Sequence, residues 1–114
     1  MYAILLLVSP ALASDFIEGF EDIPLADGFR QLDEQGFSFG NEESGYTEAI
    51  ITADKHTKFN DAIQFYLDTL PKLGWNLKEK NRTHLIFIRD GNILEISRLQ
   101  VTPLKISVNM KSEN

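Results

Sequence analysis

The sequence predicts an α+β domain in which one amphipathic helix packs on a mostly antiparallel sheet of four to five strands. The expected order is β-α-β-β-β-β in two layers. Apolar residues recur at helical spacing between Lys58 and Leu73. After Gly74 the apolar period changes to two, the period of a strand. The dipeptide Asp90-Gly91 then separates two alternating runs, as in a tight β-hairpin.

The first expected strand covers residues 47–53, "TEAIITA", which are rich in β-branched side chains. Thr57 is the expected N-cap of the helix that follows. Because Pro71 lacks a backbone donor, the helix should end at Leu70 or continue with a distorted last turn. Gly74 suits the left-handed position beyond its end. We expect the apolar side of this helix to lie in the core of the domain; that side carries Phe59, Ala62, Ile63, Tyr66, Leu67, Leu70 and Leu73.

The turn at residues 90–91 fixes the register of the two strands that it joins. Counted outward from the turn, the expected pairs are Arg89–Asn92, Ile88–Ile93, Phe87–Leu94, Ile86–Glu95 and Leu85–Ile96. The final run, "LKISVNM", alternates in the same way and should point Leu104, Ile106, Val108 and Met110 towards the core.

The other face of the hairpin carries Ile86, Ile88 and Ile93, which is too much apolar surface for a face fully open to water. Two covers are possible. One is the N-terminal arm, whose aromatic residues include Phe16, Phe20 and Phe29. The other is a partner protein. These six residues form the predicted partner surface.

Charge is distributed unevenly along the chain, whose net charge is −6. Residues 15–48 contain ten acids and one base, whereas residues 49–114 contain seven acids and ten bases. We therefore divide the chain into an acidic arm, residues 14–46, and an α+β domain, residues 47–114, and expect the arm to contact the basic part. The overall sign argues against nucleic-acid binding.

The first residues, "MYAILLLVSPALAS", are typical of an export signal. An apolar run from Tyr2 to Val8 precedes a Ser-Pro break and the small-x-small triplet Ala11-Leu12-Ala13. The run is too short for a transmembrane helix, which needs about 20 residues. Cleavage after Ala13 would remove residues 1–13. Because no basic residue precedes the run, the signal is incomplete as written and its true start would lie elsewhere; the alternative is a buried N-terminal strand or helix.

Three stretches resemble a pattern found in small exported proteins of alphaproteobacteria. They are "EDIPL" at residues 21–25, "FYLDTLPKLGW" at 65–75 and "LIFIRDGNILEI" at 85–96. The resemblance covers about residues 20–110, and its motifs are a helix end, a tight turn and a strand pair. It implies export and an α+β fold. The family has no assigned activity, so no catalytic or binding residue is implied for this chain.

Reactive groups are scarce. The chain has no cysteine, and its two histidines, His56 and His84, are not in metal-ligand spacing. No catalytic, cofactor-binding or metal-binding residues are predicted, and no cofactor. The sequence therefore favours a non-catalytic, periplasmic or secreted accessory or protein-binding module whose partner is another envelope protein. The alternative is a binder of a small ligand or lipid in a cavity between helix and sheet, lined by Trp75, Tyr66 and Phe87.

Overall fold

The structure, a computed structural model, describes residues 16–20, 22–39, 45–54 and 56–112. The predicted signal peptide, residues 1–13, lies outside them. The elements in chain order are β1 (Phe29–Phe39), β2 (Tyr46–Ala53), α2 (Phe59–Thr69), the 3-10 helix η1 (Leu70–Leu73), β3 (Asn76–Lys80), β4 (His84–Arg89), β5 (Asn92–Gln100) and β6 (Lys105–Ser112). One helix packed on an antiparallel sheet confirms the predicted α+β class.

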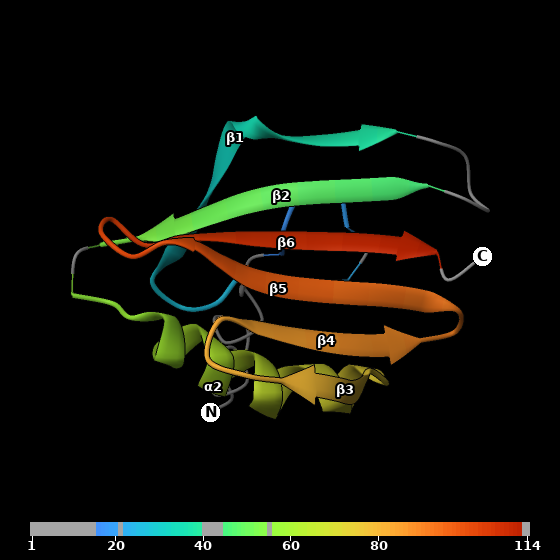
Figure 1. The fold of residues 1–114 in the computed structure, drawn as a ribbon. Helices are drawn as coiled ribbons and strands as arrows, with labels where there is room; N and C mark the ends of the chain where they lie inside the picture. The colour runs from blue at the N-terminus through green and yellow to red at the C-terminus, as the bar shows by residue number, and fades with distance from the viewer. Residues whose placement is uncertain (1–15, 21, 40–44, 55, 113–114) are drawn as a thin grey trace, which may run out of the picture.

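The sheet has six strands in the order β1-β2-β6-β5-β4-β3, and all neighbours are antiparallel (Figure 1). The predicted number of four to five strands was therefore too low. The additional strand is β1, an edge strand formed by residues that were predicted to belong to the acidic arm. The strand β6 lies in the middle of the sheet, between β2 and β5, although it is the last strand in the chain.

The helix α2 begins one residue later than predicted. Lys58, not Thr57, occupies the N-cap, and its backbone N–H donates to Asp61 Oδ2 at 2.9 Å. Thr57 instead donates its hydroxyl to Asp54 Oδ1 at 3.1 Å, which holds the preceding turn. Because the Asp61 carboxylate already accepts the N-cap N–H, the helix start is stabilised without a hydroxyl cap.

The end of the helix follows the prediction closely. The α-helical part ends at Thr69, and Pro71 lies in the tighter turn of η1. Gly74 adopts φ 95°, in the left-handed region, and the Trp75 N–H returns to the Leu70 carbonyl at 3.1 Å. The chain thereby reverses direction, and the Trp75 side chain enters the core with 1% of its surface exposed.

The predicted hairpin register is confirmed pair for pair between β4 and β5. Asp90 and Gly91 have φ values of 49° and 80°, as a type I′ turn requires. Leu104, just before β6, is buried in the core with Ile106 and Val108 of β6, and Met110 packs against this core, as expected. The alternation fails in β3, where a register shift follows Leu77, and this side chain is 44% exposed.

The core lies between the sheet and a layer made of α2 and the described arm. The arm contributes Ile17, Phe20, Ile23 and Ala26, all buried in the same cluster as the apolar side of α2. The Tyr66 hydroxyl of α2 donates to the Pro24 carbonyl at 2.7 Å. The helix thus shares its face of the sheet with the arm, and its apolar side lies inside the domain. Leu73 is the exception: beyond Pro71 the tighter turn of η1 leaves it 37% exposed, so its predicted place in the core was wrong.

Arg89 on the hairpin contacts Asp22 of the arm and the Trp75 ring, and we call this cluster of three side chains the latch. The Arg89 guanidinium makes two hydrogen bonds to the Asp22 carboxylate, at 3.0 and 3.1 Å. It also donates to the Leu73 carbonyl at 2.9 Å and lies 4.3 Å from the centroid of the Trp75 ring. This ion pair confirms that the acidic arm contacts the basic part of the chain.

Candidate functional site

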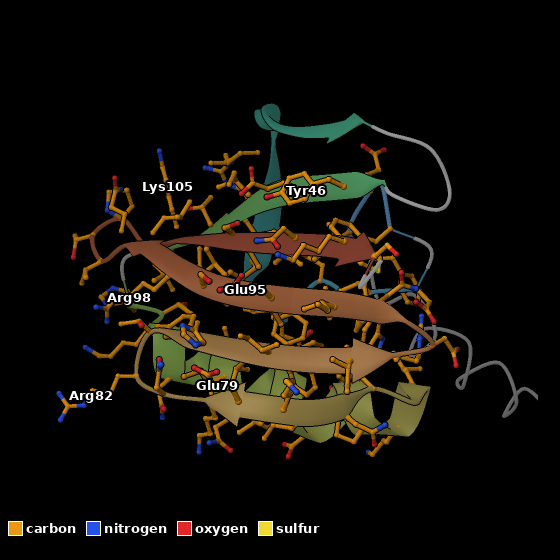
Figure 2. All side chains as sticks on the ribbon, turned by 45° about the vertical axis from the view of Figure 1, so that its right-hand side comes forward. Tyr46, Glu79, Arg82, Glu95, Arg98 and Lys105 are labelled. Carbon is orange, nitrogen blue, oxygen red and sulfur yellow. The ribbon has the colours of Figure 1, made fainter. Side chains whose placement is uncertain are left out.

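The face of the sheet away from α2 is the predicted partner surface, and Figure 2 looks onto it with the helix behind. Ile86, Ile88 and Ile93 all lie there, and we call them the isoleucine patch. Ile88 and Ile93 are direct cross-strand neighbours, and Ile86 follows two residues before Ile88 on β4. Each is partly exposed. The two strands therefore place three aliphatic side chains together on a sheet face.

The three phenylalanines of the predicted surface do not join this patch. Phe20 and Phe29 are each 8% exposed and belong to the core on the helix side. Phe16 is 55% exposed and forms an isolated bridge with Pro24 within the arm. The described arm residues before β1 therefore pack against the face opposite to the isoleucines and do not cover them.

Carboxylates flank the isoleucine patch. Glu95 on β5 and Glu79 on β3 lie directly opposite Ile86 in the two ladders that β4 forms. The row continues through Asn109 on β6 to Glu48 on β2. Figure 2 shows Glu79 and Glu95 on the viewer's side of the sheet. An acidic row thus crosses the sheet beside the aliphatic side chains.

The negative charge of these carboxylates affects the ionisation of Tyr46, which lies on β2 on the same side of the sheet as the isoleucine patch. Partial burial, and then the negative charges of Glu48 and Glu95, raise the pKa of the Tyr46 phenol. The Glu48 carboxylate accepts a hydrogen bond from the buried Ser107 hydroxyl at 2.6 Å, which fixes its position. Glu48 is therefore an ordered negative group on this face, which also carries a cation, Lys111, directly opposite Ile93 and Tyr46.

Neither histidine forms a reactive cluster. His84 Nε2 lies 2.8 Å from Glu79 Oε2 at the edge of the sheet, whereas His56 is exposed in the turn before α2. Within the residues that the structure describes, no three His, Asp or Glu side chains gather closely enough to hold a metal ion. In the same residues, no helix has the length and apolarity needed to cross a membrane.

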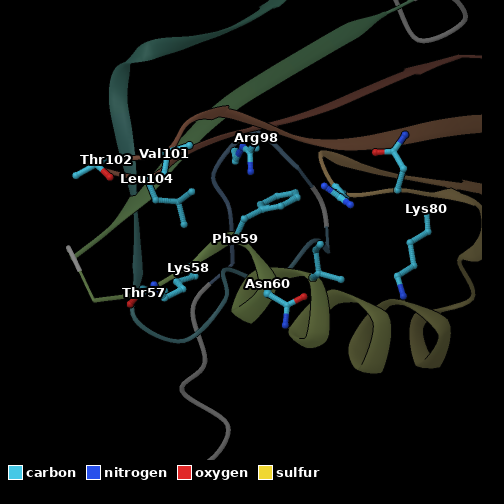
Figure 3. Close-up of a pocket in the computed structure, with 12 residues that line it drawn as sticks. Thr57, Lys58, Phe59, Asn60, Lys80, Arg98, Val101, Thr102 and Leu104 are labelled. Atoms are coloured by element: carbon cyan, nitrogen blue, oxygen red, sulfur yellow. The ribbon is translucent and has the colours of Figure 1, made fainter.

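The cavity predicted between helix and sheet does not lie where the sequence placed it. Trp75, Tyr66 and Phe87 are each 0–1% exposed and are packed in the core. A pocket of about 720 Å³ opens instead at the N-terminal end of α2 (Figure 3), and these three residues do not line it. The sequence contains no signal for this pocket, because its residues come from α2, β3, β5 and the loops beside them.

In comparisons with known proteins, the sequence matched no family model and no curated protein, and the fold matched no solved structure.

Proposed function

We propose that this chain is a non-catalytic, exported binding module that docks an envelope protein on the outer face of its sheet. The observation that carries the proposal is the isoleucine patch, which the described arm residues before β1 leave uncovered because they pack on the other face. Apolar groups of this kind are buried when a partner supplies matching apolar surface. The signal-like N-terminus and the resemblance to small exported alphaproteobacterial proteins support export.

The chemistry of the partner follows from the surroundings of the patch. Glu79 and Glu95 lie on either side of Ile86, and Glu48 extends the same row. A complementary surface would present aliphatic side chains flanked by Lys or Arg. Aliphatic contact would supply the buried area, and the opposite charges would set orientation and the rate of encounter.

Site-specific photocrosslinking in the native host tests this proposal. A photoreactive amino acid at Ile88 should give one discrete crosslinked product, whereas the same group at Gln64, exposed on α2, should give none. Glu95→Lys should weaken the Ile88 crosslink, and Asp68→Lys on the exposed side of α2 should leave it unchanged. Equal products from both positions, or no product from Ile88, would refute docking on this face.

Fractionation and N-terminal sequencing of the same cells test export. The expected mature chain begins at Ser14 and is found in the periplasmic or extracellular fraction. An uncleaved chain confined to the cytosol would contradict the export part of the proposal while leaving the crosslinking result to decide the docking part.

A further inference from the structure

The pocket at the N-terminal end of α2 is a second, separate site. It opens between the first turn of α2, the β3–β4 turn and the β5–β6 loop (Figure 3). Its volume of about 720 Å³ is within the range of known small-molecule sites. It lies at the helix side of the molecule, whereas the isoleucine patch lies on the opposite face of the sheet. The two sites can therefore be tested independently.

Four cationic side chains line this pocket, and no carboxylate of the described residues does. They are Lys58 at the helix N-cap, Lys80 at the end of β3, Arg82 in the following turn and Arg98 on β5. Among the described residues, none of the four is joined to a carboxylate by an ion pair. In a chain of net charge −6, this local excess of positive charge favours an anionic ligand.

The first turn of α2 adds to this field. Phe59 and Asn60 line the pocket and are the first two residues of the helix. The positive end of the helix dipole therefore lies at the pocket wall, but the Asp61 carboxylate in the same turn accepts the Lys58 N–H and offsets part of it. A negative group placed here would interact favourably chiefly with the four cations.

The floor of the pocket is apolar. Phe59, Ile63 and Leu104 line it and belong to the core, with exposed fractions of only 6%, 5% and 2%. Val101 forms an apolar part of the rim and is 63% exposed. A small inorganic anion would leave the exposed Val101 side chain and the edge of this apolar floor in contact with water, and a neutral lipid would leave the cations unpaired. A ligand that has both an anionic head and an apolar body satisfies both requirements.

We propose that this pocket binds an amphiphile with an anionic head, namely a carboxylate or phosphate on an aliphatic chain. The head lies among Lys80, Arg82 and Arg98, and the chain lies along Phe59, Ile63 and Leu104. The site is concave, which favours one molecule bound from solution. The same chemistry is present in an anionic bilayer, and the exposed Val101 on the pocket rim, at 63%, would contact its apolar interior, so the bilayer needs a separate arm of the test.

The test is a titration of the full mature chain with dodecanoate, monitored through the NMR chemical shifts of the amide and methyl groups of the protein. Dodecanoate below its micelle concentration should shift the signals of Ile63, Val101 and Leu104 in a saturable way and leave those of Ile88 and Ile93 unchanged. Acetate, which lacks the chain, and dodecyl maltoside, which lacks the charge, should each bind at least about tenfold more weakly. Co-sedimentation with phosphatidylglycerol vesicles, compared with phosphatidylcholine vesicles, distinguishes a bilayer from a free ligand.

Matched variants locate the binding. Arg82→Gln combined with Arg98→Gln should weaken dodecanoate binding about tenfold, because both removed charges face the head group. Val101→Ser, at an exposed rim position, should weaken it a fewfold without affecting folding. Lys72→Gln, an exposed cation in η1 that does not line the pocket, should have no effect. The proposal is overturned if dodecanoate shifts no pocket signal, if the neutral amphiphile binds equally well, or if Lys72→Gln weakens binding as much as the double variant. Binding to anionic vesicles without binding of free dodecanoate would overturn the assignment to a free ligand.

Discussion

Removal of the Arg89 side chain should destabilise the protein far more than removal of any other single arginine. Three contacts would be lost together in Arg89→Gln. The bidentate ion pair with Asp22 joins side chains that are 21% and 41% exposed, so solvent screens it and it contributes about 0.5–1 kcal/mol. The hydrogen bond to the Leu73 carbonyl adds about 1 kcal/mol. The stacking over Trp75 adds about 0.5–1 kcal/mol.

The expected loss in free energy of unfolding is therefore about 2–3 kcal/mol, or about 8–13 °C in the melting temperature of a domain of this size. Asp22→Asn should cost only about 1 kcal/mol, because the other two Arg89 contacts remain. The measurement is urea unfolding of both single variants and the double variant, followed by far-UV circular dichroism. Fluorescence of the single tryptophan, Trp75, is a second probe.

The double-mutant cycle decides whether the latch exists as described. A coupling free energy of about 0.5–1 kcal/mol between Arg89 and Asp22 is expected. Arg82→Gln, an exposed pocket arginine without an ion pair among the described residues, serves as the control and should cost less than about 0.5 kcal/mol. Strictly additive effects of Arg89→Gln and Asp22→Asn, or equal costs for Arg89→Gln and Arg82→Gln, would refute the reasoning.

Three further predictions concern the core and the turns. Leu70→Ala should lower the free energy of unfolding in urea by about 3 kcal/mol, because Leu70 is 0% exposed. Leu77→Ala, at a side chain that is 44% exposed, is the control and should cost about 0.5 kcal/mol or less. Equal costs would mean that the helix is not packed as described. Gly91→Ala should cost about 1–2 kcal/mol, and only through backbone strain at φ 80°, since no atom lies within 4 Å of the added methyl group; an unchanged melting temperature would contradict the type I′ turn. Burial raises the pKa of the Tyr66 phenol above its ordinary value. The phenol therefore stays protonated in the folded state, whereas the same phenol in the unfolded chain ionises at about pH 10. The contribution of Tyr66 to the free energy of unfolding is therefore complete below that pH and falls as the pH rises further. Tyr66→Phe should cost about 1 kcal/mol at neutral pH, by loss of the bond to the Pro24 carbonyl, and should reduce this alkaline loss of stability; an identical decline in both proteins above pH ~10 would show that Tyr66 does not cause it.

The features that were predicted correctly from the sequence are those determined by residues close to one another in the chain. The Asp90-Gly91 turn admits one register, so the pairing of β4 with β5 followed directly from counting residues. Pro71 and Gly74 determined how the helix ends in the same local way. Side-chain alternation in β6 identified its buried face before its place in the sheet was known.

The features that were missed depend on contacts between distant parts of the chain. β1 escaped prediction because its sequence, "FRQLDEQGFSF", contains polar residues and a glycine and lacks a regular apolar period. The place of the arm is set by contacts such as Asp22–Arg89, which join residues 67 positions apart. The basic pocket is assembled in the same way, since Lys58, Arg82 and Arg98 share no sequence motif.

The position of β6 determines how the molecule can be built. β6 joins β1–β2 on one side to β3–β5 on the other, so a chain cut after Gln100 would retain a two-stranded and a three-stranded unit with no ladder between them. The sheet cannot be completed before residues 105–112 are available. A ribosome-bound fragment lacking them would expose the unpaired edges of β2 and β5. A synthetic peptide with the β6 sequence, added to a chain that lacks these residues, would then complete the sheet by pairing with β2 and β5. Addition of the peptide would thereby control when the sheet assembles.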